Sequence, residues 1–279
     1  MLILACGPLG NAGDTTARVK SALESVPYIA AEDSRKLARL TSDLAIRYSG
    51  KVISYFEGNE VERLGQLTEI LLSGEDLLVI TDAGAPGISD PGYRLIRAAI
   101  DNQIPIEVLP GPSAVTTALL LSGLPTDRFC FEGFSPRTSG TRKSWYENLL
   151  LEERTIVFFE APHRLQDSLR DALEIFGPSR RVAICREMTK RYEESVRGTL
   201  EELVAWSNEG EILGEITIVL AGFDPTTRTH SAAELVQLVL ARESAGELRK
   251  DAIAAIAKEL DLPKRLVFDA MVGSKALER

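Results

Sequence analysis

One stretch of the chain combines the residue types that a ligand site needs. Residues Ile80–Gly92 read Ile-Thr-Asp-Ala-Gly-Ala-Pro-Gly-Ile-Ser-Asp-Pro-Gly and follow the apolar run Asp76–Ile80. Glycine lets a backbone approach a ligand closely, and proline restricts a loop to few conformations. Open α/β sheets bind ligands at the carboxyl ends of their strands, so we expect a ligand site here. An ordinary β–α turn is the alternative, although thirteen residues is long for one.

Charged residues form a second candidate group. Glu32-Asp-Ser-Arg-Lys36 directly follows the apolar residues Tyr28–Ala31. Ionisable side chains at the carboxyl end of a strand are candidates for site chemistry. The same residues also suit the start of a helix over 36–40, with Asp33 or Ser34 as its N-cap. Both interpretations remain open from the residues alone.

Two further stretches rich in glycine and proline, Cys6–Gly13 and Pro110–Ala114, also follow short apolar runs. Such loops before a helix offer backbone N–H groups to a ligand. The first is neither a Walker loop nor a G-x-G-x-x-G motif, so it indicates no particular nucleotide. We expect Asp14 to cap a helix over 15–24.

The elements that position these loops follow from the apolar pattern. Repeated strand–loop–helix units predict an α/β domain with a mainly parallel sheet. The expected strands are 2–5, 28–31, 52–55, 76–80 and 106–109. The expected helices are 15–24, 36–40, 60–72, 93–100 and 115–122.

The pattern changes after Gly123 and predicts a second, mixed α/β domain. Its expected strands are 128–134, 155–160, 181–186, 194–198 and 215–221, and its helices are 164–176 and 200–207. Three short helices close the chain. They resemble a helix-turn-helix, either as a DNA reader or, as we favour, as a small packing module. The predicted domains are 1–111, 112–224 and 225–279.

Composition limits the function classes. The chain has 279 residues, 44% of them hydrophobic, and a net charge of −9, so it is not a general nucleic-acid binder and any polyanion must meet local basic patches. No apolar run is long enough to span a bilayer, and no secretory signal opens the chain. Three cysteines without C-x-x-C spacing indicate core residues of a reduced, cytoplasmic protein. Two histidines exclude a histidine-rich metal site, and we expect no metal.

Nine short motifs in register resemble one family. They are Gly-Asn-Ala-Gly-Asp (10–14), Ala-Glu-Asp-Ser-Arg (31–35), the loop 81–92, Leu-Pro-Gly-Pro-Ser-Ala (109–114), Gly-Leu-Pro-Thr-Asp-Arg-Phe (123–129), Glu-Gly-Phe-Ser-Pro-Arg (132–137), Glu-Ala-Pro-His-Arg-Leu (160–165), Arg-Glu-Met-Thr-Lys (186–190) and Gly-Glu-Ile (214–216). Together they are similar to the small-subunit ribosomal RNA cytidine 2′-O-methyltransferases of the tetrapyrrole-methylase superfamily. The resemblance covers 2–222, and the tail is similar to the helical module of these enzymes.

The resemblance implies a fold, a cofactor and partners. The fold is the two-domain α/β fold of class III S-adenosylmethionine methyltransferases, with a small C-terminal helical module. It implies a homodimer that holds S-adenosylmethionine between its domains and methylates a decoding-region cytidine of 16S rRNA in the 30S subunit. We expect neither membrane nor DNA as a partner. The implied cofactor contacts are Pro8, Leu9, Gly10, Asp82, Ala83, Gly84, Gly87, Ile88, Ser113, Ala114, Glu160, Pro162, Cys185, Glu215, Ile216 and Thr217.

Methyl transfer to a ribose hydroxyl needs alignment above all, and a general base adds to it. The candidate bases are Asp33, Glu160, Glu187 and Lys190, of which we favour Asp33 and Lys190. Relatives tend to carry histidines beside Asn59 and Glu60, but this chain has none there. His163 is as well explained by a structural role as by a catalytic one. The expected phosphate contacts are Arg35, Arg137 and Arg164.

Three other functions remain to be weighed. The same fold could methylate a tetrapyrrole or another small molecule. A non-catalytic adapter that binds RNA or a nucleotide through its tail would have no affinity for S-adenosylmethionine. A nucleotide hydrolase lacks the phosphate-binding lysine and the metal carboxylates that it needs.

Overall fold

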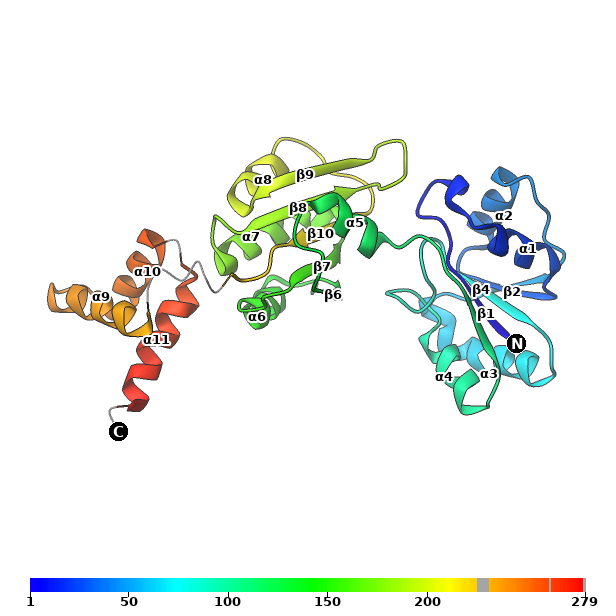
Figure 1. Cartoon of the computed structure of the whole chain (residues 1–279), viewed down its shortest axis with the longest axis horizontal. Coiled ribbons are helices and arrows are strands. Elements are labelled where there is room, and N and C mark those ends of the chain that lie inside the picture. Colours follow the sequence, from blue (N-terminus) through cyan, green and yellow to red (C-terminus); the bar gives the residue numbers. More distant parts are fainter. Residues whose placement is uncertain (225–230, 261, 278–279) are drawn as a thin grey trace. The chain divides into compact units, whose positions relative to one another are not determined.

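Two five-stranded sheets organise the chain. The computed structural model describes residues 1–224, 231–260 and 262–277 (Figure 1). These residues form two compact units. The first unit is 1–117 with 187–194, and the second is 118–186 with the described residues of 195–279. The predicted domain boundaries after residues 111 and 224 remain predictions.

The first unit contains a parallel sheet whose strand order is β3-β2-β4-β1-β5. The strands are β1 (Leu2–Ala5), β2 (Tyr28–Ala31), β3 (Lys51–Ser54), β4 (Leu77–Ile80) and β5 (Ile106–Leu109). The central strands β1 and β4 are buried throughout, as their uninterrupted apolar runs predict. Because all five strands are parallel, their carboxyl ends meet at one edge of the sheet.

Helices cover both faces of this sheet. They are α1 (Ala17–Ser25), α2 (Ser34–Asp43), α3 (Glu60–Leu72) and α4 (Tyr93–Asp101). The first two pack on one face and the other two on the opposite face, each pair closing its own apolar core (Figure 1). Helix α5 (Ala114–Ser122) follows β5.

The start of α1 differs from the expectation. Its N-cap is Thr16, whose hydroxyl accepts a hydrogen bond from Val19 N. Asp14 lies instead at the end of the short 3-10 helix η1 (Ala12–Asp14), which the Asn11 side chain caps. The prediction that Asp14 caps this helix is wrong, because the 3-10 turn takes up these polar residues before the α-helix begins.

The second unit contains a mixed sheet, as predicted, and its strand order is β6-β7-β10-β8-β9. Strands β6 and β7 are parallel, whereas β10 is antiparallel to both β7 and β8. The strands are β6 (Phe129–Phe134), β7 (Thr155–Glu160), β8 (Arg181–Arg186), β9 (Glu194–Thr199) and β10 (Ile216–Leu220). The amino end of β10 therefore lies beside the carboxyl ends of β7 and β8.

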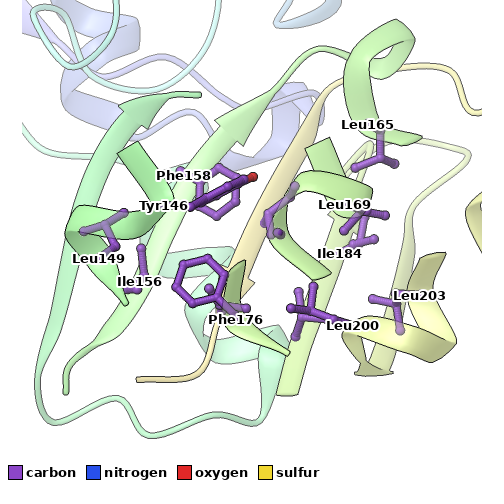
Figure 2. Close-up of a cluster of buried hydrophobic side chains, with 14 of the residues drawn as sticks. Tyr146, Leu149, Ile156, Phe158, Leu165, Leu169, Phe176, Ile184, Leu200 and Leu203 are labelled. Atoms are coloured by element: carbon purple, nitrogen blue, oxygen red, sulfur yellow. The ribbon is translucent and has the colours of Figure 1, made fainter. Parts of the chain in front are cut away.

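An apolar core joins this sheet to three helices. They are α6 (Ser139–Leu149), α7 (Leu165–Phe176) and α8 (Leu200–Ser207). Figure 2 shows Tyr146, Phe158 and Phe176 gathered in this core, with edge contacts among the rings. One ion pair is buried beside it: Arg142 Nη2 lies 2.6 Å from Asp171 Oδ2. The sequence pattern did not predict α6.

The chain ends in helices α9 (Ala232–Ser244), α10 (Arg249–Glu259) and α11 (Lys264–Leu277). They pack on one another around a small core that includes Leu235, Val239, Ile253 and Val267. This arrangement confirms the predicted helical module. Among the described helices, none has the length and apolar character needed to cross a membrane.

The three cysteines Cys6, Cys130 and Cys185 are free and buried, as their apolar context predicts. Burial raises the pKa of the Cys6 thiol, and it raises the pKa of the Cys130 thiol to about 11. Both thiols therefore stay protonated near neutral pH, which suits small core residues rather than nucleophiles.

Candidate functional site

The loops after β1, β4 and β5 meet at the carboxyl edge of the first sheet. Gly7 and Gly84 form an isolated antiparallel bridge, in which Gly7 N donates to Gly84 O over 2.8 Å and Gly84 N donates to Gly7 O over 3.2 Å. On the other side, Cys6 N donates to Leu109 O. A Cβ on Gly111 would lie 2.9 Å from Cys6 O, so the close approach of these loops requires glycine there. The loop after β1 is thus in contact with both of the other loops.

The group Glu32–Lys36 joins the same edge from β2. The Asp82 carboxylate accepts a hydrogen bond from Asp33 N and forms an ion pair with Lys36 Nζ at 2.8 Å. In return, Asp82 N donates to Glu32 Oε2 over 3.0 Å. Asp33 caps α2 by accepting a hydrogen bond from Arg35 N, which confirms the interpretation as a helix start, whereas a role in site chemistry stays a prediction.

The two carboxylates of this segment differ in basicity. Arg35 donates to both oxygens of Asp33, through Nε at 3.0 Å and Nη2 at 2.6 Å. These hydrogen bonds hold the pKa of Asp33 far below its usual range. Burial, in contrast, raises the pKa of Glu32, with Asp82 N acting against it. Glu32 is therefore the stronger proton acceptor of the pair.

The loop Asp82–Gly92 has a backbone that few residues can adopt. Gly84 and Gly87 have φ angles of +71° and +84°, in the left-handed region that favours glycine. Gly92 has a φ of +140°, and a Cβ there would lie 3.0 Å from Gly87 N. The loop turns back on itself, because Gly87 N donates a hydrogen bond to Pro91 O. Ile88 is half exposed at its tip.

A partly buried carboxylate fixes the far end of this loop. Glu60 Oε1 accepts hydrogen bonds from Gly92 N at 3.0 Å and from the Tyr55 hydroxyl at 2.9 Å. Arg94 Nε lies 3.4 Å from Glu60 Oε2. Burial and the hydrogen bond to Glu60 raise the pKa of Tyr55, so its hydroxyl remains a donor. Glu60 anchors the loop to the first turn of α3.

A distant segment, 187–194, belongs to the same unit and lies on the first loop. Asn11 N donates to the Thr189 hydroxyl over 3.2 Å. The Lys190 side chain crosses Gly10 so closely that a Cβ there would overlap Lys190 Cγ and lie 3.0 Å from its Cε. Its ammonium forms an ion pair with Glu187 at 2.8 Å. The predicted catalytic residue Lys190 thus lies beside the predicted cofactor residue Gly10.

The second unit brings the remaining predicted residues together at one end of its sheet. In the registers of β10, Ile216 lies opposite Glu160 and Thr217 lies opposite Cys185. The Cys185 thiol lies 3.8 Å from Ala118 O and is inaccessible to solvent. Glu215 precedes this strand and is exposed, and Pro162 begins the short helix η3 (Pro162–Arg164).

The buried carboxylate of Glu160 organises that end of the sheet. It accepts hydrogen bonds from the Ser135 hydroxyl and from Ala161 N, and Arg164 Nη2 lies 2.8 Å from its Oε1. Arg164 also donates to Ser135 O. Glu160 therefore connects the ends of β6 and β7, and Arg164 is held in this network. Arg137, by contrast, is exposed.

Sequence reasoning did not single out Glu60, and it did not distinguish Glu32 from the other charged residues of the stretch 32–36. Glu60 reads as an acidic residue in the first turn of a helix, and only the buried Tyr55 hydroxyl and Gly92 N reveal its function. Glu32 could have been recognised, because a carboxylate directly after a buried strand is partly desolvated. The remaining predicted residues of the first unit lie on the loops described above, with Pro8 and Leu9 buried in the first loop.

Comparison with known proteins assigns the family. The family of tetrapyrrole (corrin/porphyrin) methylases matches residues 1–204, and the chain belongs to it. A Mycobacterium tuberculosis (strain ATCC 25618 / H37Rv) protein named ribosomal RNA small subunit methyltransferase I is 45% identical, covering 98% of this chain and 95% of that protein. The protein of the same name from Halalkalibacterium halodurans is 39% identical, covering 96% and 93%.

A solved structure shows the same fold. The uroporphyrin-III C-methyl transferase of Thermus thermophilus, complexed with S-adenyl homocysteine, matches with a TM-score of 0.52 at 19% identity, covering 78% of this chain and 96% of that chain. These comparisons confirm the predicted resemblance, fold class and methyltransferase activity. They also confirm S-adenosylmethionine as the methyl donor of the family.

The residues of the first unit fit this cofactor. A sulfonium cation with an amino-acid head favours carboxylates and backbone carbonyls. The three carboxylates of Glu32, Asp33 and Asp82 lie at the sheet edge, and the loop with Gly84 and Gly87 offers peptide groups that no Cβ shields. The donor set is therefore of the right chemical kind, and the hydrogen bonds within it fix its arrangement.

Proposed function

We propose that this protein uses S-adenosylmethionine to methylate the ribose 2′-hydroxyl of a cytidine in the decoding region of 16S rRNA, within the 30S subunit. The observation that carries the proposal is the extent of the similarity. The methylase family matches residues 1–204, whereas the relatives named for small-subunit ribosomal RNA cover 96–98% of the chain, including the C-terminal helices. An enzyme for small molecules does not account for that similarity.

The chain's own residues then have distinct tasks. When bound, S-adenosylmethionine supplies an electrophilic methyl group. The predicted cofactor residues of the first unit would hold it, namely Pro8–Gly10, Asp82–Gly84, Gly87, Ile88, Ser113 and Ala114. Glu160, Pro162, Cys185 and Glu215–Thr217 stay proposals for the second unit. Since Glu160 already accepts two hydrogen bonds and forms an ion pair with Arg164, its main task is to order the surrounding backbone.

Catalysis requires that the ribose hydroxyl be aligned and lose its proton. Asp33 and Lys190 are the proposed catalytic residues, but their ion pairs suit positioning better than proton removal. Asp33 orients Arg35 toward the solvent edge, where Arg35 would contact a phosphate. The ammonium of Lys190 would stabilise negative charge on the hydroxyl oxygen. Glu32, whose pKa is raised, is the proposed proton acceptor.

Arg35, Arg137 and Arg164 are the proposed RNA contacts. Arg35 and Arg137 are exposed, whereas Arg164 is mostly buried and would act by ordering the segment around Ser135. Local cations are needed because the whole chain is acidic. We propose a cytoplasmic homodimer as the working form.

Methyl transfer to purified 30S particles, compared with transfer to a porphyrinoid, tests the proposed function. We expect label from S-adenosylmethionine in 16S rRNA alone, and mass spectrometry should locate it on the ribose of one cytidine. Binding to particles should weaken steeply with salt, because phosphate contacts release counterions. Label in the porphyrinoid, or a base-methylated nucleotide, would refute the proposal.

Variants of the proposed catalytic residues complete the test. At saturating cofactor we expect Glu32→Gln, Asp33→Asn and Lys190→Met each to lower turnover. If Glu32 accepts the proton, turnover of the wild type should rise with pH as Glu32 ionises, and Glu32→Gln should abolish this rise. A residue whose variant keeps full turnover has no part in the reaction.

A further inference from the structure

The exposed aromatic ring of Phe134, in the second unit, is held in place by its neighbours and has no role in the function proposed above. Phe134 ends β6, and 56% of its surface is exposed. Its ring meets the Phe159 ring edge to face, with centroids 5.3 Å apart and planes inclined at 62°. Phe131 meets the same Phe159 ring at 4.9 Å. In an edge-to-face pair at least one face of each ring stays uncovered by the other.

A β-bulge places Phe134 on this face of the sheet. Phe131 pairs with Val157 and Phe134 pairs with Phe159, so β6 has one residue more than β7 between these pairs. In a regular strand, residues 131 and 134 would point to opposite faces. The bulge includes Gly133, whose φ of +70° suits the bulge type that glycine forms. Bulges of this kind often re-aim a side chain next to an active site.

Hydrogen bonds fix the backbone that follows the ring. Ser135 N donates to Phe159 O, and the Ser135 hydroxyl donates to Glu160. Arg164 donates to Ser135 O over 3.3 Å, and Arg142 donates to Pro136 O over 3.2 Å. With this backbone held by four bonds, the ring is ordered before any ligand binds, which lowers the entropy cost of binding.

Two exposed basic residues lie on the segments connected to Phe134. Arg137, three residues further on, is exposed and makes no ion pair among the described residues. His163, on the segment that Glu160 ties to Ser135, is also exposed. The nearest acidic neighbour in sequence, Glu132, acts on Cys130, which is buried in the core on the opposite face. An exposed aromatic ring and a cation three residues away in sequence supply the two contacts that bind single-stranded nucleic acid, base stacking and a phosphate contact.

We propose that Phe134 is a stacking platform for an unpaired base of the substrate RNA, with Arg137 contacting an adjacent phosphate. This inference rests on the proposed function and deepens it by naming a contact to the base. The Phe159 ring supports Phe134 and is itself packed against Phe131, and the bulge at Gly133 orients Phe134. The contact selects a single-stranded region without reading its sequence, because every base has a π-face.

The test compares Phe134→Leu, which keeps apolar bulk but no π-face, with Phe134→Trp, which keeps stacking. Stacking on one base corresponds to about a 5- to 150-fold change in affinity. We expect Phe134→Leu to raise KM for 30S particles within that range, and Phe134→Trp to restore it. The matched control is Phe129→Leu, at the other end of the same strand and 38% exposed, which should leave KM unchanged.

Further measurements distinguish base stacking from a role of Phe134 in cofactor binding or dimerisation. The Kd for S-adenosylmethionine, the melting temperature and the sedimentation coefficient should be the same in Phe134→Leu and the wild type. A weakened cofactor Kd would assign the ring to the cofactor site, and a loss of dimer would assign it to a subunit interface; either result overturns the inference. If the wild type methylates 30S particles and Phe134→Leu is unaffected, the inference fails while the proposed function stands.

Discussion

The contact between Gly10 and Lys190 gives the sharpest prediction about the candidate site. A Cβ on Gly10 would overlap Lys190 Cγ and lie 3.0 Å and 3.1 Å from its Cε and Cδ. Real Cβ contacts are essentially never shorter than 3.0 Å, so Gly10→Ala must displace Cγ, and Cδ and Cε must shift by a few tenths of an ångström. Because Cγ is positioned by the χ1 angle, either the Lys190 side chain rotates and loses its ion pair with Glu187, or the segment 187–194 moves.

We therefore expect Gly10→Ala to lower both stability and turnover. Overpacking costs about 1–3 kcal/mol, and the hydrogen bond from Asn11 to Thr189 is strained as well. A displacement on the order of 1 Å at a reacting centre reduces turnover by about 10²-fold. The measurements are the free energy of unfolding in urea, followed by circular dichroism, and kcat at saturating cofactor and 30S particles.

A double-mutant cycle identifies the cause. Lys190→Ala removes Cγ, Cδ and Cε, so Gly10→Ala should cost nothing further in that background. The matched control is Gly65→Ala in α3, where the added Cβ meets no atom within 4 Å. It should stabilise the protein by about 0.5–1 kcal/mol and leave kcat unchanged. Equal destabilisation by Gly10→Ala in both backgrounds would refute the overlap with Lys190.

Three further outcomes follow from buried or paired charges. Glu60→Ala leaves Gly92 N without its acceptor and should lower the free energy of unfolding by about 1–3 kcal/mol and raise the Kd for S-adenosylmethionine, measured by calorimetry, with Glu60→Gln milder. The pKa of Glu152 is lowered from 4.5 to about 2, chiefly by hydrogen bonds from its neighbour Arg154, so its contribution to stability is present above pH 4.5 and lost as the pH falls toward 2. Glu152→Gln should therefore reduce the fall in the free energy of unfolding, measured in urea, as the pH is lowered from 4.5 to 2. An unaltered pH dependence would contradict this role of Glu152. Arg142→Met leaves the buried Asp171 without its guanidinium partner and should lower the free energy of unfolding, measured in urea, by about 3–5 kcal/mol. The double variant with Asp171→Leu should recover most of that loss.

The strands of the sheet were predictable because consecutive apolar residues in the sequence indicate a buried strand. Leu77-Leu-Val-Ile80 is apolar at every position, and the structure buries every one of them as a central parallel strand. The three glycine-rich loops were predictable for the same reason, since each follows such a run. The pattern also located Asp33 at a strand end, where it both caps a helix and binds Arg35.

What the sequence did not predict depends on partners that are distant in the chain. Helix α6 buries Arg142, a residue that reads as solvent-exposed, and only Asp171, 29 residues further on, accounts for its burial. The same holds for Lys190, whose neighbour Gly10 is far away in sequence. Local apolar periodicity carries no information about such pairs.

The backbone conformations support the assignment of the site independently. Among the described residues, five other than glycine have positive φ angles: Ala45, Ser89, Gln103, Glu187 and Thr189. Ala45 and Gln103 follow the last turns of α2 and α4, where a left-handed residue commonly ends a helix.

The other three do not end a helix, and all lie on the loops of the candidate site. Ser89 has a φ of 61° on the loop after β4, while Glu187 and Thr189 have φ angles of 50° and 64° on the segment that carries Lys190. Each such residue costs on the order of 1–3 kcal/mol and persists only where its surroundings determine its conformation. Here Lys190 N donates to Glu187 O, and Asn11 N donates to the Thr189 hydroxyl. Strain held in this way sets the position of the Lys190 ammonium, whereas glycine at these positions would leave it free to move.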